Sequence, residues 1–369
     1  MNNRVIAFYL PQFHQIPEND MWWGEGFTEW VNVRKAKPLF TNHYQPRVPL
    51  NENYYDLSDV EVMKWQTQIA KEHGLYGFCF YHYWFSEKPI LEKPILNYLK
   101  CHDIDFPYCI CWANESWTNA WAQSDNKVIM EQTYGEKKEW KQHFDFLLPF
   151  FKDDRYIKED GFILLVIYRP YLSGCMIQML DYWKELAIEN GFSGIRVASQ
   201  RFEKPDSYPE LFNYMDYHIE YQPDYDRCHI RKEKTGIARA KSIVHSCILD
   251  MVNIDISLHR KKGRPEIFDY DEMWQKIINT PPISNKAIAG GFVDWDNTPR
   301  HGIRGSCFKG VSPHKFEFYM RKQFEHVHKD YNNNYLFLFA WNEWGEGGYM
   351  EPDEKNGFAY LEALKQSLK

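Results

Sequence analysis

Two glutamates, Glu343 and Glu346, stand where a buried strand is expected to end, and their spacing suits chemistry on a glycosidic bond. They follow the unbroken apolar segment 335–340, which is typical of a strand buried on both faces. Breaking or making a glycosidic bond needs two carboxyl groups, one protonated to serve the leaving oxygen and one ionised. Residues three positions apart on a continuing strand face opposite ways, but Gly345 and the pair Gly347-Gly348 let the chain turn. We therefore expect both acids to face one cleft; the alternative is two solvated glutamates at a strand end.

The overall composition favours a large enzyme-sized barrel and excludes some classes of protein. A chain of 369 residues suits a single α/β barrel with insertions. The net charge of −7 argues against a dedicated nucleic-acid binder. The aromatic share is 17%, and the 14 Trp and 25 Tyr exceed what a core needs. Rings with a polar edge suit stacking on sugar faces, and they also suit protein interfaces.

The cysteines and the N-terminal segment bear on cofactors and location. The eight cysteines show neither disulfide nor metal-ligand spacing, so we predict no metal and no other cofactor. The apolar segment 5–10 is too short for a signal peptide and lacks a small-residue cleavage site, so we interpret it as the first strand. No apolar stretch approaches the ~18 residues of a transmembrane span. These features predict a cytoplasmic protein with reduced thiols.

Strand-like apolar segments alternate with helix-like segments along the chain. Eight candidate strands begin near residues 5, 77, 108, 162, 195, 215, 287 and 336, and the candidate helices cover 59–73, 89–100, 136–150, 174–190, 208–213, 270–279, 314–328 and 357–368. This order predicts one α/β domain, residues 1–369, folded as a (β/α)₈ TIM barrel. A doubly wound open sheet would normally carry a Gly-rich phosphate loop after its first strand. This chain has Pro-Gln-Phe-His at 11–14 instead.

Two long insertions interrupt the alternation. The first, 11–58, follows strand one, is rich in Trp, Pro and Tyr, and is expected to fold over the barrel mouth. The second, 222–269, lies between strands six and seven. Its segment 227–264 holds ten Lys/Arg against three Asp/Glu. This segment is either an amphipathic helix with a solvated basic face or a docking surface for an anionic group, such as a nucleotide, a lipid-linked pyrophosphate or an acidic membrane.

The expected strand ends repeat one chemical type, a ring beside an amide or a carboxylate. Barrel enzymes carry their chemistry at the carboxyl ends of the strands. Rings suit the C–H faces of sugars and planar polar groups suit sugar hydroxyls, so the pattern predicts a carbohydrate cleft. The candidate substrate-binding residues are His82, Tyr83, Trp84, Trp112, Asn114, Glu115, Tyr168, Arg169, Glu220, Trp295, Asp296, Asn297, Trp341, Asn342 and Trp344.

Each of these residues also has a purely structural interpretation. Trp112 and Trp295 can be core rings, Glu115 can form a salt bridge with Arg169, and His82 can be a hydrogen-bonded structural histidine. Asp-x-Asp triplets occur at 224–226, 269–271 and 294–296, and only the last lies at an expected strand end. Such triplets hold a metal and a sugar nucleotide in many glycosyltransferases, but they also arise by chance.

Six segments together resemble the WbsX-like family, whose members are usually labelled glycosyltransferases of lipopolysaccharide or O-antigen synthesis. The resemblance covers nearly the whole chain and is carried by residues 9–14, 22–30, 43–46, 77–81, 111–115 and 341–347. The family is in turn similar to glycoside hydrolase family 99, the endo-α-mannosidases and endomannanases. That second resemblance is confined to the barrel plan and the Asn-Glu-Trp-x-Glu-Gly segment at 342–347.

The resemblance to the hydrolases implies a metal-free mechanism that retains anomeric configuration. Glu343 would act as base on the 2-hydroxyl of the substrate, which attacks the anomeric carbon and gives a 1,2-anhydro sugar. Glu346 would protonate the leaving group and then activate the acceptor. The hydrolases typically carry His where this chain has Gly345, so a ring that would line the cleft is missing and the substrate and the acceptor can differ.

The combined hypothesis is a carbohydrate-active enzyme that acts on an α-linked glycan, mannan-like or a surface polysaccharide, with hydrolysis as the first interpretation. The alternative is a cytoplasmic glycosyltransferase or transglycosylase of lipopolysaccharide, O-antigen or capsular polysaccharide synthesis. It would use the basic segment 227–264 to contact an anionic surface or a lipid-linked glycan. A third hypothesis is a glycan-binding protein without turnover. The expected partner is an oligosaccharide or polysaccharide, and no nucleic acid is expected.

Overall fold

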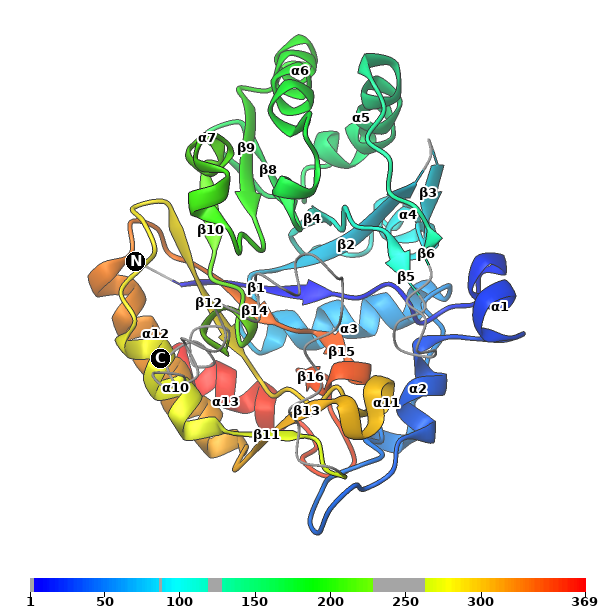
Figure 1. Cartoon of the computed structure of the whole chain (residues 1–369), viewed down its shortest axis with the longest axis vertical. Coiled ribbons are helices and arrows are strands. Elements are labelled where there is room, and N and C mark those ends of the chain that lie inside the picture. Colours follow the sequence, from blue (N-terminus) through cyan, green and yellow to red (C-terminus); the bar gives the residue numbers. More distant parts are fainter. Residues whose placement is uncertain (1–2, 86–87, 119–127, 228–262) are drawn as a thin grey trace, which may run out of the picture.

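Eight parallel strands close into a barrel in the computed structural model, which describes residues 3–85, 88–118, 128–227 and 263–369 (Figure 1). Each strand pairs in parallel with the next, and β14 pairs with β1 to complete the ring. The predicted TIM barrel is confirmed, and the open-sheet alternative is wrong. The barrel strands are β1 (Arg4–Tyr9), β2 (Gly77–Phe85), β4 (Tyr108–Trp112), β8 (Phe162–Ile167), β9 (Gly194–Ser199), β10 (Tyr217–Ile219), β12 (Ala287–Phe292) and β14 (Tyr335–Phe339).

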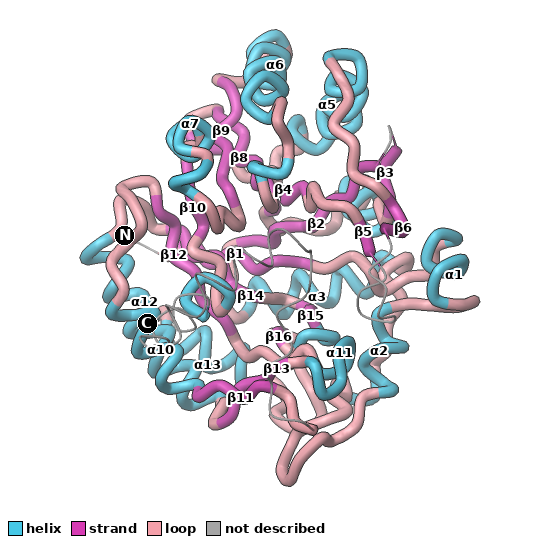
Figure 2. The backbone as a smooth tube through the Cα atoms, viewed as in Figure 1, coloured by secondary structure: helices cyan, strands magenta, loops and turns pink. Residues whose placement is uncertain are grey.

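Helices surround the strands, as Figure 2 shows, and they begin and end within a few residues of the expected positions. Side-chain caps explain several starts: Asp59 accepts a hydrogen bond from the amide of Glu61, and Glu136 and Glu139 form a reciprocal capping box. The helices between and after the barrel strands are α3 (Val60–Glu72), α4 (Lys93–Lys100), α5 (Lys137–Lys152), α6 (Met176–Glu189), α7 (Pro209–Tyr214), α10 (Tyr270–Asn279), α12 (Pro313–Asp330) and α13 (Ala359–Ser367).

The barrel interior is filled by aromatic rings. The Phe8 ring lies 5.4 to 5.6 Å from the rings of Tyr81, Tyr221 and Phe337, which come from three other strands or strand ends. All nine residues of β2 are buried. Because successive residues of a strand point to opposite faces, one set of its side chains enters the barrel and the other packs under the helices.

The first insertion packs against the end of the last strand. It contains α1 (Pro17–Trp23) and α2 (Glu29–Lys35). The Trp30 ring lies 4.5 Å from the Phe13 ring and 5.5 Å from the Trp344 ring. The indole of Trp30 donates a hydrogen bond to the carbonyl oxygen of Tyr55 at 2.8 Å. This packing brings α2 to the C-terminal end of the barrel.

The second insertion is described only at its ends. Residues 228–262 lie outside the described part of the chain, so the prediction of a basic docking surface or amphipathic helix at 227–264 is not tested. After them, β11 (Glu266–Asp269) pairs in parallel with β13 (Ser306–Lys309) outside the barrel. No helix in the described ranges is both long and apolar enough to cross a membrane.

Gly290 on β12 lies where the backbone at the end of β10 approaches β12 closely. A Cβ at this position would lie 1.9 Å from the carbonyl oxygen of Glu220, at the end of β10. We expect Gly290→Ala to lower the free energy of unfolding by at least ~2 kcal/mol, because backbone must move to admit the methyl group. Urea denaturation followed by circular dichroism measures the effect.

Gly174→Ala is the matched control, because a Cβ there meets nothing within 4 Å. It should change the free energy of unfolding by less than ~0.5 kcal/mol. Equal effects of the two substitutions would contradict the tight contact between β10 and β12.

Candidate active site

A cavity of about 270 Å³ opens at the C-terminal ends of the barrel strands, and both predicted acids line it. Glu343 and Glu346 therefore share one space, as the glycine-rich turn indicated. Rings form much of the remaining wall, together with Arg300 from outside the predicted set. The aromatic lining residues are Trp23, Tyr81, Tyr83, Trp117, Tyr168 and Tyr221.

A tight turn brings the two acids to the same side. β15 (Asn342–Glu343) pairs antiparallel with β16 (Gly348–Tyr349), and a 3₁₀ turn (Trp344–Glu346) joins them. Gly347 has a φ of +70°, and a Cβ there would lie 2.9 Å from the amide nitrogen of Asp296. Both the left-handed backbone and the close approach require glycine at this position.

One guanidinium connects the acid pair to a third carboxylate. Arg300, on α11 (Thr298–His301), places Nη1 2.7 Å from Glu346 Oε1 and Nη2 3.3 Å from Glu343 Oε2. Its Nε lies 2.9 Å from Oε1 of Glu29, a fully buried residue of α2. Arg300 and Glu29 were not predicted as site residues, because neither belongs to a spaced motif of acids.

Glu29 gives a physical reason for the glycine at position 345. A Cβ on Gly345 would lie 2.0 Å from Glu29 Oε1 and 3.0 Å from Arg300 Nε. The volume that a side chain at 345 would enter is thus filled by the Glu29 carboxylate. A histidine at this position, as in the resembling hydrolases, is incompatible with Glu29 where it stands.

Burial keeps protons on the acid pair at higher pH than usual. Burial raises the pKa of Glu343 to about 8; Arg300 lowers it, and the charges of Glu346 and Glu29 raise it further. Burial also raises the pKa of Glu346; Arg300 opposes this effect, and Asp224 and Glu29 add to it. Since the charge of Glu346 raises the pKa of Glu343, the two titrate as a pair that holds a proton near neutral pH.

Three further predicted residues line the cavity: Tyr83, Glu115 and Tyr168. Glu115 also accepts a hydrogen bond from Nη1 of Arg169 at 2.5 Å, so the salt bridge considered as an alternative is present. Arg169 itself is not among the residues that line the cavity. It lies behind Glu115, where its second contact is Glu203 at 3.4 Å.

Two predicted asparagines fasten neighbouring strand ends instead of lining the cavity. Asn342 accepts from the amide of Leu10 at 2.7 Å and donates to the Leu10 carbonyl at 3.0 Å. Asn114 forms the same pair of bonds with the backbone of Arg169, at 2.8 and 2.9 Å. In both cases the next residue is a glutamate that lines the cavity, so each asparagine fixes the backbone from which an acid projects.

The tryptophans of strand eight are structural. Trp341 and Trp344 are fully buried. The indole of Trp344 donates to Glu351 at 2.6 Å, and Glu351 also accepts from Tyr55 and Gln66. These contacts hold the turn that carries Glu343 and Glu346. Trp341 and Trp344 do not line the cavity, so the geometry does not support their assignment to sugar subsites.

His82, Trp84 and Trp112 point to the outer side of the barrel wall. Side chains alternate along β2, so Tyr81 and Tyr83 enter the cavity while His82 and Trp84 face α5. The sequence did not reveal which alternate set faces inward, because both faces of the strand are apolar. These three residues lie by a second cavity.

The predicted residues after strands six and seven also lie outside the cavity. Glu220 accepts hydrogen bonds from the amide of Ile283 at 2.9 Å and from the hydroxyl of Tyr331 at 2.5 Å. Burial raises its pKa to about 7. Asn297 accepts from the amide of Ser306, and Trp295 donates to the hydroxyl of the same serine. β10 pairs only with the start of β12, since His218 lies opposite Ala287, the first residue of β12. β10 therefore ends nearer the N-terminal side of the barrel, and Glu220, which follows it, lies outside the cavity.

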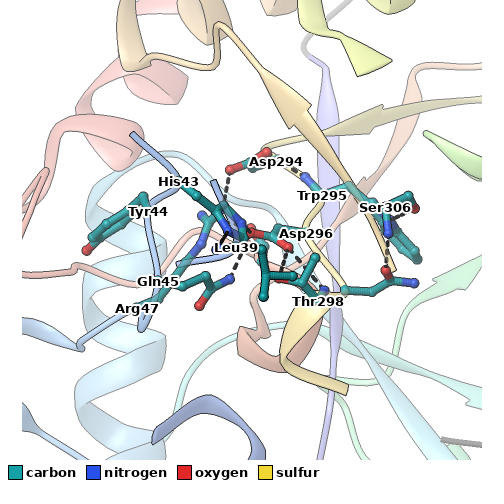
Figure 3. Close-up of polar contacts among 12 residues, drawn as sticks. Leu39, His43, Tyr44, Gln45, Arg47, Asp294, Trp295, Asp296, Thr298 and Ser306 are labelled. Atoms are coloured by element: carbon teal, nitrogen blue, oxygen red, sulfur yellow. Dashed lines mark hydrogen bonds and ion pairs between the residues drawn. The ribbon is translucent and has the colours of Figure 1, made fainter. Parts of the chain in front are cut away.

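Asp296 anchors the first insertion, as Figure 3 shows. Its Oδ2 accepts from His43 and Gln45, both at 2.8 Å, and its Oδ1 accepts from Thr298. Next to it, Arg47 donates to Asp294 at 2.7 Å. The Asp-x-Asp triplet at 294–296 is thus used to hold the insertion.

His43, Asp296 and Cys307 are close enough to hold a metal ion, with ligand atoms within 4.8 Å of one another. Their bonding fits a hydrogen-bonded network better. Nδ1 of His43 accepts from the amide of Leu39, so the ring proton is on Nε2, which then donates to Asp296 and has no lone pair for a metal. Burial raises the pKa of Cys307 to about 12, which keeps the thiol protonated.

A closed (β/α)₈ barrel with paired acids in a ring-lined cavity is typical of carbohydrate-active enzymes. Residues 5–364 match the family described as "Glycosyltransferase WbsX", and the chain belongs to that family. The family description and the barrel together support a carbohydrate-active enzyme.

The curated relatives are longer than this chain. It is 34% identical over 367 residues to WxcX of Xanthomonas campestris pv. campestris strain B100, covering 99% of the chain and 49% of the relative. The WxcX of strain ATCC 33913 is 33% identical with the same coverage. The chain therefore spans about half the length of these relatives.

Solved structures share the fold at low identity. The GH99 endo-α-mannosidase of Bacteroides thetaiotaomicron superposes with a TM-score of 0.56 and 13% identity, covering 100% of this chain and 97% of that one. A "glycoside hydrolase-like protein" superposes with a TM-score of 0.59 and 11% identity, covering 100% and 94%. These likenesses show the barrel fold.

The contact between Glu29 and Arg300 predicts a change in how the acid pair titrates. The charge of Glu29 raises the pKa of both acids, so Glu29→Gln should lower both pKa values. Titration of ¹³C-labelled glutamate carboxyls by NMR measures this, with Glu343→Gln and Glu346→Gln used to assign the signals. Glu189→Gln, an exposed site at the end of α6, is the control and should leave the titration unchanged. Unchanged midpoints in Glu29→Gln would contradict the electrostatic role of Glu29.

Proposed function

We propose that this protein acts on an α-linked glycan with retention of configuration, with Glu343 and Glu346 as the acid–base pair, and that it hydrolyses the linkage. The observation that carries the proposal is the shared cavity in which both acids bond the same guanidinium. A buried pair that keeps one proton near neutral pH supplies both states that the reaction requires, one acid and one base.

The order of roles is the one that the resemblance to the family 99 hydrolases implies. Glu343 accepts the proton of the 2-hydroxyl as that oxygen attacks the anomeric carbon, and the bond to the leaving oxygen breaks. Glu346 protonates the leaving oxygen; it then takes a proton from the acceptor as the 1,2-anhydro ring opens, and the 2-oxygen regains its proton from Glu343. Every proton that is removed is returned, so neither acid is consumed.

The arrangement of Arg300 sets a condition on this mechanism. Its contact with Glu346 is shorter than its contact with Glu343, which favours the shared proton on Glu343. For Glu343 to act as base, substrate binding must transfer that proton to Glu346. A sugar hydroxyl that donates to Glu343 has this effect, because a hydrogen bond to the ionised form stabilises that form.

Transfer to a sugar acceptor is the second candidate, and the description of the WbsX family as glycosyltransferases favours it. The chemistry at the anomeric carbon is the same, and only the second acceptor differs. The cavity rings Trp23 and Trp117 suit stacking on either a substrate sugar or an acceptor sugar. If the protein is a transferase, we also propose a cytoplasmic location and an anionic or lipid-linked partner that contacts residues 227–264.

Removal of either acid tests the proposed pair. We expect Glu343→Gln and Glu346→Gln each to lower kcat at least ~10²-fold on an α-linked oligosaccharide, the usual scale for a general acid or base. On glycosyl fluorides, whose leaving group needs no protonation, Glu346→Gln should still release fluoride in the first turnover and be slow in later ones, because ring opening by the acceptor still needs its base. Glu343→Gln should release fluoride slowly from the first turnover on.

Circular dichroism confirms that the variants are folded, and Glu189→Gln serves as the surface control. Near-parental activity in both single variants would refute the assignment of the pair. Normal glycan binding with no turnover in the parent protein would instead establish the glycan-binding hypothesis.

Hydrolysis and transfer leave different marks on the products. In ¹⁸O-labelled water, hydrolysis of an α-linked oligosaccharide should place heavy oxygen at the new reducing end, since water is the acceptor. Mass spectrometry detects this label. Longer oligosaccharides without the label, or products formed only when a sugar nucleotide or a lipid-linked donor is added, would replace the hydrolytic proposal with transfer.

A further inference from the structure

The helix α1 presents a buried amide to the acid-pair cavity. Asn19 is the buried residue of this seven-residue helix, with 3% of its surface exposed, and it lines the cavity together with Trp23. The two residues are four positions apart, so they lie on one face of the helix. Met21, which is 73% exposed, lies on the solvent side of α1. A helix that packs on a protein normally buries apolar side chains, so packing alone does not account for an asparagine at this position.

The fold does not use the Asn19 amide. In the described part of the chain, its side chain forms no hydrogen bond, and neither Oδ1 nor Nδ2 is closed to solvent. Because the residue is buried elsewhere and lines the cavity, its amide opens into the cavity. Asn97 on α4 shows the more usual arrangement, since its Nδ2 donates to the carbonyl oxygen of Ser58 at 3.0 Å. The free amide of Asn19 is thus available to a ligand.

Contacts on either side of Asn19 fix α1 at the cavity. Asp20 Oδ1 accepts hydrogen bonds from the amides of Gly26 at 2.9 Å and Phe27 at 3.3 Å. Glu18 forms an ion pair of 3.1 Å with Lys88, the first residue of β3 (Lys88–Ile90). These contacts hold the backbone on both sides of Asn19, so the amide is presented in a defined position.

A tryptophan connects α1 to the rest of the cavity wall. Trp117, on β5 (Trp117–Thr118), lines the cavity, and its ring lies 5.8 Å from the ring of Trp22 on α1. The same ring lies 5.1 Å from the ring of Tyr83, which also lines the cavity. The Asn19 amide therefore belongs to a wall with aromatic rings, which suit the C–H faces of sugars.

The charges of the cavity favour a neutral ligand at α1. The lining residues that come from the first insertion and from β5 are all uncharged: Gln12, Asn19, Trp23, Trp117 and Thr118. The carboxylates elsewhere in the wall already bond arginines, Glu115 with Arg169 and the acid pair with Arg300. A cation thus meets no unpaired carboxylate at α1, and an anion meets an excess of acids over Arg300 in the cavity.

An asparagine amide places one acceptor and one donor group side by side. Two adjacent hydroxyls of a sugar match this arrangement, because one can donate to Oδ1 while the other accepts from Nδ2. A purine base can also pair with such an amide. The phosphates of a nucleotide, however, would bring negative charge into a cavity with three carboxylates among its lining residues.

We propose that Asn19 determines which glycans this cavity accepts, by bonding two adjacent hydroxyls of one neutral pyranose ring that packs against the tryptophans of the wall. A ring that lacks either hydroxyl is rejected, because it leaves part of the buried amide unpaired. The proposal rests on the proposed function for the nature of the ligand, a glycan. It adds a requirement for a free vicinal diol.

Calorimetric binding tests this role. The double variant Glu343→Gln/Glu346→Gln is titrated with a panel of α-linked trisaccharides of mannose, glucose and galactose, so that turnover does not change the ligand. We expect at least one trisaccharide to bind, and Asn19→Leu in the same background to raise its dissociation constant ~10-fold or more, the scale of two hydrogen bonds. The melting temperature of Asn19→Leu should stay equal or rise, because an apolar side chain of similar size replaces an unpaired amide.

Asn97→Leu is the matched control, with the opposite expectation. Asn97 is also a helix asparagine, but its amide bonds the protein and it does not line the cavity. This substitution should lower the melting temperature and leave sugar binding unchanged.

Monodeoxy forms of the bound trisaccharide identify the diol. A form that lacks a hydroxyl bonded by Asn19 should bind more weakly to the double variant, and should lose no further affinity when Asn19→Leu is added. An equal loss with and without Asn19 for every deoxy form would contradict the proposed contact.

The side-chain amide signal of Asn19 gives a test that does not depend on the folding of Asn19→Leu. In ¹⁵N-labelled double variant this signal, assigned by its loss in Asn19→Asp, should shift and saturate as the trisaccharide is added. The proposal is overturned if no trisaccharide shifts the signal, if adenosine shifts it and the sugars do not, or if Asn19→Leu binds as tightly as its background.

The two proposals can fail separately. Asn19-dependent binding of a sugar that the parent protein does not turn over would refute the proposed reaction and support the role of Asn19. Turnover of a sugar whose binding Asn19→Leu does not weaken would refute the role of Asn19 alone.

Discussion

The candidate active site is organised by the interaction of one guanidinium with three buried carboxylates. Arg300 bonds Glu29, Glu343 and Glu346, and one positive charge cannot balance three negative charges in a desolvated site. The excess is relieved by protonation, which the raised pKa values of Glu343 and Glu346 express. The proposed acid–base chemistry thus depends on an incomplete balance of charge that the fold imposes.

The first insertion contributes directly to this excess of negative charge. The insertion supplies Glu29, which sits against Gly345 and leaves no room for a side chain there. The same segment is held to strand seven by His43 and Gln45 through Asp296. An Asp-x-Asp triplet that could have been taken for a metal site therefore serves to position a charged residue of the acid cluster.

Much of the fold was predictable from the sequence, because the signals for its strands and helices lie within short segments of the chain. Each barrel strand is a short apolar segment followed by a helical segment, and α3, α5, α10 and α12 also carry caps from neighbouring side chains, so neither needs distant information. The shared orientation of Glu343 and Glu346 was predictable because the glycines around them allow a turn. Arg300 and Glu29 were not predictable, since their contact joins residues 271 positions apart.

The side of the wall occupied by each ring was not predictable either. β2 is buried throughout, so its sequence has no polar alternation to show which residues face inward. His82, Tyr83 and Trp84 were all assigned to the cleft, whereas Tyr83 lines it together with Tyr81, and His82 and Trp84 do not. The asparagines at 114 and 342 were placed at the right strand ends, but each amide bonds the backbone of a neighbouring strand end, at Arg169 and at Leu10, and neither lines the cavity.

The bond pair between Asn342 and Leu10 lies at the junction of the first and last strands, beside the hydrogen bond from Trp341 to Phe8. During synthesis on the ribosome, the N-terminal strand emerges long before its partner exists. The acid-bearing hairpin can therefore be fixed against β1 only after residues 341–349 have followed it from the ribosome. A product that ends before residue 342 keeps β1 but lacks both acids and the asparagine that ties the hairpin to Leu10.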